Sequence, residues 1–230
     1  MIIRRSGALL GLTLLLTSCS AVSGTTAPTP AGSSAGTAPA PAPSASSTSS
    51  AASTSTGTGA QPDRATLQAR WWTWAMSSPT DRNPVADEDG RYCAEAQPGD
   101  VWFLAGTFGG SVTRSSRVPS GLPLAFPLVN LVADRDGCET FMEAALAGAT
   151  FDGKPLKPVE YPPTEVTVHG VVGNPVHPEG GTFRTMACGF WAQVPPPAKG
   201  RHRLTISGYA GDFAVKVSYN LIVGPAGGDI

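Results

Sequence analysis

The sequence predicts a mainly β domain, an antiparallel Ig-like β-sandwich with one or two short helices, that follows a disordered N-terminal linker. Residues 20–60 contain almost only Ala, Ser, Thr, Gly and Pro, and such a composition cannot bury enough apolar surface to offset the entropy of ordering. Beyond them, short stretches of strand-forming residues alternate with Gly-rich and Pro-rich turns, which is typical of a sandwich. Only two stretches show helical features.

The first predicted element is a helix over residues 64–76, with Asp63 as its N-cap. Leu67, Trp71 and Trp74 recur on one bulky apolar face, which we expect to pack on the sheet. Trp72 points away from that face in this prediction, and it is therefore the candidate for an exposed ring that stacks on a ligand. The alternative is that the tryptophans only hold the helix on the sheet, because each buries a large area.

The strands are expected where apolar and β-branched residues lie between turns. An Asp152-Gly153 pair predicts a tight hairpin, and residues 139–146 predict a second short helix that Gly148 ends. Prolines in the third strand favour an edge or a bulged position for it. The last two strands look like the end of an Ig-like module. The expected strands cover residues 101–107, 111–114, 122–128, 164–168, 189–194, 203–207 and 213–223.

The N-terminus predicts export. Arg4 and Arg5 precede the uncharged run 6–17, which has the length of a signal-peptide core and is shorter than the 20 or so residues of a membrane-spanning helix. The run ends in Leu16-Thr17-Ser18-Cys19, which resembles the lipobox of bacterial lipoproteins. The resemblance implies cleavage after residue 18 and lipidation, including palmitate, at Cys19. The alternative is an ordinary secretory signal that happens to contain a cysteine.

These observations divide the chain into a signal peptide (1–18), a lipidated Cys19 with its linker (19–61) and a β-sandwich domain (62–230). The linker would span roughly 35 Å as a random coil. All 17 acidic residues lie in the domain, and no block of basic residues is present, so nucleic-acid binding is disfavoured. We expect the domain to sit on the extracytoplasmic side of the cell membrane, held there by the lipid anchor.

The first part of the domain carries a recognisable set of motifs. They are Trp71-Trp72-Thr73-Trp74, Asn83-Pro84, Asp87, Gly90, Cys93, Gln97, residues 101–106, Val118-Pro119, Gly121 and residues 126–130. This pattern resembles a group of secreted bacterial proteins of unknown function, and it implies no activity because none is known for the group. In the pattern a cysteine falls at Ser116, so a local bridge to Cys93 is missing from this chain. The resemblance therefore leaves Cys138 and Cys188 as the disulfide candidates and Cys93 as the candidate free thiol, either plainly buried or reactive.

No metal or cofactor is expected. His169, His177 and His202 invite a copper site with Met186 or Cys188, but no histidine follows Cys188 within a short loop, as copper sandwiches require. The acidic turns 87–90 and 134–137 lack the alternating ligands of a calcium loop and are expected to be solvated turns.

The sequence shows no nucleophile elbow, phosphate loop, zinc-binding helix or Cys-x-x-Cys pair. A Ser-His-Asp arrangement stays open, because triads assemble across distant segments. We therefore expect a membrane-anchored lipoprotein of unknown molecular function, a non-catalytic binding or structural module whose partner is peptidoglycan or an envelope protein. The alternative is an envelope hydrolase. A deep cleft that joins a histidine with a carboxylate and a hydroxyl favours the enzyme, and a flat surface with Trp72 exposed favours the binder.

Overall fold

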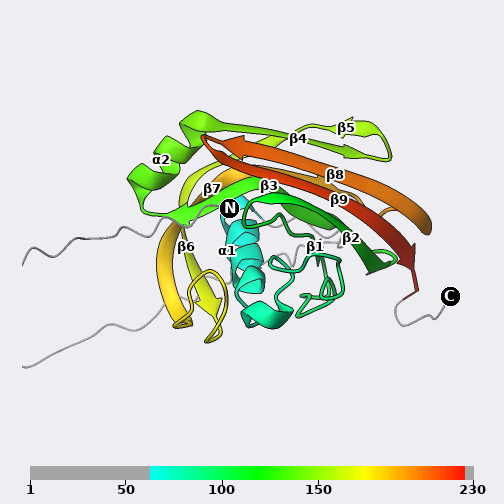
Figure 1. Cartoon of the computed structure of the whole chain (residues 1–230), viewed down its shortest axis with the longest axis horizontal. Helices are drawn as coiled ribbons and strands as arrows, with labels where there is room; N and C mark the ends of the chain where they lie inside the picture. Colours follow the sequence, from blue (N-terminus) through cyan, green and yellow to red (C-terminus); the bar gives the residue numbers. More distant parts are fainter. Residues whose placement is uncertain (1–62, 226–230) are drawn as a thin grey trace, which may run out of the picture. The chain divides into compact units, whose positions relative to one another are not determined.

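A computed structural model describes residues 63–225, so the signal peptide, Cys19 and the linker lie outside the described residues. The prediction of a mainly β domain is confirmed: one sheet has the strand order β1-β3-β7-β6 and the other β2-β9-β8-β4-β5 (Figure 1). The elements are α1 (Arg64–Ala75), η1 (Thr80–Arg82), β1 (Trp102–Phe103), β2 (Gly110–Pro119), β3 (Leu124–Ala133), α2 (Arg135–Ala144), β4 (Ala145–Phe151), β5 (Lys154–Leu156), β6 (Val159–Gly170), β7 (Gly181–Val194), β8 (Gly200–Ala210) and β9 (Phe213–Gly224).

Both sheets are mixed, and not wholly antiparallel as expected. β1 pairs with β3 in parallel, and β2 pairs with β9 in parallel. The connections explain this. After β1 the chain crosses to the other sheet to form β2 and then returns as β3, and such a crossover brings a strand back in the same direction. Strands joined by tight turns, such as β8 and β9, remain antiparallel.

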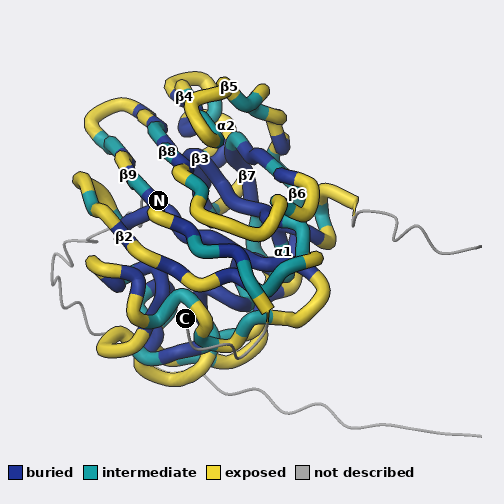
Figure 2. The backbone as a smooth tube through the Cα atoms, turned by 90° about the vertical axis from the view of Figure 1, so that its right-hand side faces the viewer, coloured by how far each residue is buried: buried dark blue, intermediate teal, exposed yellow. Residues whose placement is uncertain are grey.

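The sandwich core lies between the two sheets. Residues of β9 alternate strictly, so that Val215, Val217 and Tyr219 are buried while Lys216 and Asn220 are exposed (Figure 2). This period of two is what a strand with one solvated face requires. The buried core cluster comprises Trp102, Leu104, Val118, Leu124, Phe126, Leu128, Ala149, Ala192, Val194, Leu204, Ile206, Val215, Val217, Tyr219, Leu221 and Val223.

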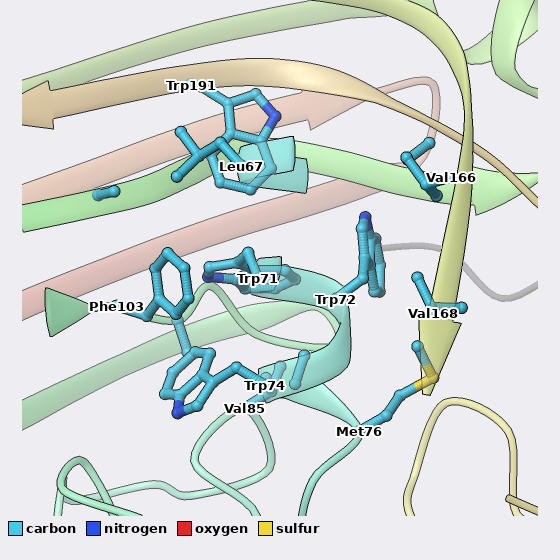
Figure 3. Packing of buried hydrophobic residues seen from close by; sticks show 14 of the residues in the cluster. Leu67, Trp71, Trp72, Trp74, Met76, Val85, Phe103, Val166, Val168 and Trp191 are labelled. Carbon is cyan, nitrogen blue, oxygen red and sulfur yellow. The ribbon is translucent and has the colours of Figure 1, made fainter. Parts of the chain in front are cut away.

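Helix α1 covers the outer face of the four-stranded sheet, so the domain has three layers. Its predicted start is confirmed: the Asp63 side chain accepts a hydrogen bond from the Thr66 backbone N–H at 3.0 Å, as an N-cap does. Trp71 packs edge-on against Trp191 of β7, with ring centroids 5.7 Å apart (Figure 3). Its indole N–H donates to the Leu104 carbonyl at 3.0 Å. The helix is therefore held both by apolar contact and by a buried hydrogen bond.

The second helix begins earlier than predicted. The Asp134 side chain accepts from the Gly137 N–H at 2.8 Å, and this cap starts α2 at Arg135, so the helix ends at Ala144. Leu146, placed in the helix by the prediction, belongs to β4. The acidic turn 134–137 is thus a helix cap, as an Asp at this position favours.

The strand predicted over residues 122–128 is β3, which begins at Leu124 after Pro123, and it is a central strand with an irregularity at Pro127. β3 lies between β1 and β7, and its register with β7 shifts between Pro127 and Val129. The expected bulge is present, and it is where a proline without a backbone N–H is tolerated inside a sheet. The Asp152-Gly153 hairpin is confirmed, with both residues at positive φ, 51° and 75°.

Arg114 of β2 points into the protein and is 1% exposed. Its guanidinium makes five hydrogen bonds, four of them to backbone carbonyls of the loop 83–107. It also donates to the Tyr219 hydroxyl at 3.0 Å, and Tyr219 donates onward to the Ala105 carbonyl at 2.9 Å. One side chain thus ties an irregular loop to the edge strand β2 and to its neighbour β9 in the five-stranded sheet. The carbonyl partners are Asp87 at 2.7 Å, Val85 at 2.9 Å, Gly106 at 2.8 Å and Ala105 at 3.1 Å.

Replacing Arg114 with Met is expected to reduce the free energy of unfolding by about 3–5 kcal/mol, because it leaves several buried carbonyls without a donor. Urea unfolding monitored by tryptophan fluorescence measures the change. Arg117→Gln, three residues along the same strand but exposed, is the matched control and should stay within about 0.5 kcal/mol. Equal stability of the two variants would contradict the role given to Arg114.

Candidate functional site

The structure pairs Cys138 with Cys188, whose Cα atoms are 5.9 Å apart. The bridge joins α2 to β7 in a small buried cluster with Phe141 and Leu131. Its sequence separation is 50 residues, and a loop of this length corresponds to about 4 kcal/mol in the chain-entropy account. The disulfide is therefore a structural element of the end of the sandwich that α2 closes.

Cys93 is the free cysteine of residues 63–225, and it is partly buried. Its Sγ atom lies in direct contact with the Ser116 hydroxyl of β2. Burial raises the pKa of the Cys93 thiol, and the Ser116 hydrogen bond only partly opposes this. A thiol with a raised pKa is protonated at neutral pH and is a poor nucleophile. The geometry thus favours the plainly buried alternative for Cys93.

The expectation that Trp72 is an exposed stacking residue is wrong. Its side chain is 0% exposed. Successive helix residues are 100° apart, so Trp72 leaves the face of Trp71, but β6 runs alongside the helix on that flank and covers it with Val166 and Val168 (Figure 3). Two flanks of α1 are therefore buried where the apolar periodicity predicted one, and Trp72 is available only for packing.

The three histidines lie at separate places. His169 hydrogen-bonds the Thr182 hydroxyl at 2.7 Å, and His177 stacks on Phe183 with centroids 4.4 Å apart. Within residues 63–225, no group of three or more His, Cys, Asp or Glu side chains is arranged to hold a metal ion. The neighbours of His169 and His177 are hydroxyl and aromatic groups of the β6–β7 hairpin, together with the Glu179 carboxylate at 3.9 Å from His177 Nδ1.

His202 has the one close histidine–carboxylate contact of the three. Its Nδ1 lies 2.7 Å from Asp152 Oδ2, and its Nε2 lies 2.8 Å from the Ala198 carbonyl. Burial lowers the pKa of His202, but the hydrogen bonds to Asp152 and Ala198 outweigh it and leave the pKa raised. In a catalytic triad the second nitrogen faces a nucleophile. Here it faces a carbonyl, so the pair binds the hairpin to the start of β8 and forms no triad.

The acidic turn 87–90 folds on itself. The Asp87 carboxylate accepts from the backbone N–H groups of Tyr92 at 2.9 Å and Asp89 at 3.2 Å. Asp89 pairs with Arg91, and the hydrogen bonds from Arg91 hold the pKa of the Asp89 carboxyl well below its usual range. The hydrogen bonds that these carboxylates accept thus come from groups of the same loop.

A hollow of about 390 Å³ lies beside α1, and we call it the α1 hollow. Trp74 and Phe103 form its apolar part, and both are almost fully buried. The hollow is bounded by helix α1, the loop 96–98 and the end of β6. Its lining comprises Ala69, Arg70, Thr73, Trp74, Ser77, Ala96, Pro98, Phe103, Thr167 and His169.

Polar groups surround the α1 hollow on two sides. Arg70, Thr73 and Ser77 follow each other at helical spacing along α1, and His169 lies opposite on β6. Arg70 pairs with Asp100, and this contact lowers the pKa of the Asp100 carboxyl. The sequence shows these polar residues at i, i+3 and i+7 of the helix. They line a hollow only because β6 and the loop 96–98 lie beside the helix.

The loop that forms one wall of the hollow is fixed by side chains. The Trp74 indole N–H donates to the Glu95 carbonyl at 2.8 Å. The Gln97 amide bonds both backbone groups of Phe103, accepting from its N–H at 2.9 Å and donating to its carbonyl at 2.9 Å. The hollow is therefore preformed by bonds that a ligand does not have to supply.

Comparison with known proteins gives no family. No protein-family model matches the chain, and no curated protein matches it. Among solved structures, the chain is similar to the structure of PbICP-C in complex with falcipain-2, at 11% sequence identity and a TM-score of 0.25, over 50% of this chain and 91% of that chain. A similarity this low carries no argument about the fold or the function.

Ser116→Cys is expected to form a disulfide with Cys93, because the two side chains already touch across 23 residues of sequence. A loop of that length should raise the free energy of unfolding by about 3 kcal/mol. Thiol titration of the unfolded protein should find two fewer free thiols in this variant than in Ser115→Cys, the control on the adjacent exposed position, which leaves Cys93 and the new cysteine unpaired. Equal numbers of free thiols in the two variants would contradict the predicted contact.

The His202–Asp152 pair predicts a stability that falls as the pH rises. The pKa of His202 is raised above 6.5 in the folded state, so its proton stabilises the fold fully below pH 6.5 and this contribution is lost as the pH rises through the folded-state pKa. The hydrogen bond from His202 lowers the pKa of Asp152. The Asp152 carboxylate therefore stabilises the fold above pH 3.8, and this contribution is lost as the pH falls through its folded-state pKa. Unfolding free energies between pH 5.5 and 8.5 measure the effect. His202→Gln should flatten the curve over this range, whereas His169→Gln should leave it unchanged.

Proposed function

We propose that this chain is a membrane-anchored extracytoplasmic lipoprotein whose Ig-like β-sandwich is a non-catalytic binding module of the cell envelope. The observation that carries the binding role is the α1 hollow, whose volume of about 390 Å³ falls in the range of small-ligand sites. The lipobox at Cys19 and the uncharged linker support the location. Neither helix of residues 63–225 has the length and hydropathy needed to cross a bilayer.

A saccharide unit of peptidoglycan fits the chemistry of the α1 hollow. Ala69, Ala96 and Pro98, with the small exposed edge of Trp74, offer apolar contact to the CH groups of a sugar ring. The Thr73 hydroxyl accepts from the His169 backbone N–H at 3.3 Å and keeps its own proton to donate to a sugar hydroxyl. The Ser77 hydroxyl donates to the Trp74 carbonyl at 2.7 Å and keeps its lone pairs to accept from one. A loop of an envelope protein is the alternative ligand, since its backbone would find the same donors and acceptors.

An envelope hydrolase remains the second candidate, and the contact between His202 and Asp152 is the observation that favours it. The bond from His202 to the Ala198 carbonyl argues against it, because a general base needs a free nitrogen facing the reacting proton. Within residues 63–225, the partner of His202 Nε2 is this carbonyl and not a serine or threonine hydroxyl. The binding module is therefore the function that the geometry supports better.

Blocking the α1 hollow tests the binding role. Thr73→Trp places a large ring at its rim, and the full-length protein in mild detergent should then lose at least about tenfold of its affinity for isolated peptidoglycan in a sedimentation assay. Thr140→Trp, the same substitution on the exposed side of α2, is the matched control and should bind as the unmodified protein does. Equal binding by both variants would remove the hollow from the proposal.

The anchor is tested separately. Cys19→Ser removes the thiol that accepts the lipid, and a protein without acyl chains has little membrane affinity. The domain should then appear in the medium or in the soluble extracytoplasmic fraction, with its fold unchanged by circular dichroism. Retention of the variant in the membrane fraction would overturn the lipid anchor.

A further inference from the structure

We propose that the outer face of the five-stranded sheet is a second binding surface, one that takes a linear polyol or sugar polymer carrying phosphate groups. We call this surface the basic face. It lies on the sheet that α1 does not cover, so it is independent of the α1 hollow. It is defined by the outward side chains of Arg117, Arg201, Arg203 and Lys216, with the hydroxyl residues Ser111, Thr113, Ser115, Thr150, Thr205, Ser207 and Ser218 between them.

The strands that form this face carry basic residues and no acidic ones. The five strands β2, β4, β5, β8 and β9 contain no Asp or Glu, although the chain as a whole carries a net charge of −1. The carboxylates next to the face are engaged or peripheral: Asp152 bonds His202 and the Arg203 N–H, and Asp212 lies in the β8–β9 turn. The strand composition thus leaves a positive surface on an acidic domain.

The four cations are available to a ligand. Arg117, Arg201, Arg203 and Lys216 are exposed, and none of them forms an ion pair with another residue of the range 63–225. By contrast, several arginines elsewhere on the surface, such as Arg91 and Arg184, pair with carboxylates. A set of unpaired cations on one acid-free face attracts anions at long range.

Strand register sets the spacing of these cations. Arg117 and Arg201 flank Ile222 on its two neighbouring strands, which places their backbones about 10 Å apart across the sheet. Lys216 lies six residues along β9 from Ile222, about 20 Å away in an extended strand. The cations therefore line a strip that is longer than a single phosphate and that matches several repeats of an extended polymer.

A row of hydroxyls crosses the middle of the basic face. Register makes Thr113, Ser218, Thr205 and Thr150 successive neighbours on β2, β9, β8 and β4. Two of them already bond each other, Thr150 and Thr205, at 2.6 Å. Hydroxyls donate and accept equally well, so this row suits the free hydroxyls of a polyol or a sugar, while the flanking arginines suit phosphate oxygens.

The polarity of the face favours this polymer over a membrane or a nucleic acid. Exposed large apolar residues occur at one end of the face, where Leu146 and Tyr209 are paired neighbours on β4 and β8, away from Arg117 and Arg201. Membrane binding needs apolar side chains among the cations, and single-stranded nucleic acid needs aromatic rings on which bases stack. Between Arg117 and Arg201 the face holds one apolar side chain, the partly buried Ile222, and the hydroxyl row at its centre contains no aromatic ring.

Binding of the full-length protein, in mild detergent, to poly(glycerol phosphate) tests the proposal. Arg201→Gln combined with Arg203→Gln should lower the affinity about tenfold at 0.1 M salt, and raising the salt to 0.5 M should weaken binding of the unmodified protein. The control is Arg82→Gln combined with Arg184→Gln, which removes the same charge from exposed positions outside the face and should keep the affinity. All variants should unfold at the same urea concentration as the unmodified protein.

Further probes separate the proposal from its alternatives. Uncharged dextran should not bind, and Thr73→Trp at the α1 hollow should leave binding to poly(glycerol phosphate) unchanged. Equal loss of affinity in the two double variants would overturn the basic face, because net charge alone would then explain binding. Tighter binding to phosphatidylglycerol vesicles or to DNA than to the polymer would also overturn it. Failure of peptidoglycan binding at the hollow leaves this test unaffected.

Discussion

The buried guanidinium of Arg114 is the interaction on which the arrangement of the domain depends. Between α1 and β2 the chain runs through a long segment with almost no strand, and its backbone carbonyls need donors inside the protein. Arg114 supplies four of these donors at once. It also donates to the hydroxyl of Tyr219 on β9, and this hydroxyl donates in turn to the Ala105 carbonyl. Arg114 thus fixes both ends of this segment, at Val85 and Asp87 and at Ala105 and Gly106, to the sheet that carries the basic face.

Side-chain amides complete what Arg114 begins. Asn83 donates to the carbonyls of Ala75 and Ser78 at 2.9 and 3.0 Å, and so closes the end of α1. Gln97 bonds both backbone groups of Phe103 in the way that a neighbouring strand would. Buried polar groups in a loop are stable only when each is paired. These side-chain hydrogen bonds fix the backbone conformation of the loop, although it contains almost no regular secondary structure.

The sequence was informative wherever a pattern is local. The cap at Asp63, the period of α1, the hairpin at Asp152 and the alternation of β9 all follow from neighbours within a few residues, and the structure has each of them. The burial of Trp72 could not be predicted in this way, because it depends on β6, which returns from far along the chain. The parallel pairing of β2 with β9 has the same origin, and so has the inward direction of Arg114.

Much the same division holds for the candidate sites. The pairing of Cys138 with Cys188 was predicted only through the resemblance that leaves Cys93 without a partner at Ser116, because the number of cysteines alone does not fix which two are joined. The α1 hollow combines a helix, a loop and the end of β6, and the basic face combines alternate residues of β2, β9, β8 and β4. Each strand contributes between one and four polar residues at alternate positions, and only the register between strands gathers them. A scan for basic blocks in the sequence cannot detect such a surface.

The parallel pairing of β2 with β9 also has a consequence for how the protein is made. The first strand of the five-stranded sheet has its partner in the last strand of the chain, about a hundred residues later, and such distant pairings form late and slowly. The sandwich cannot close until its C-terminal strand is present. For a chain that we propose to be exported, this keeps the domain open until its last residues have crossed the membrane, and folding is completed only on the far side.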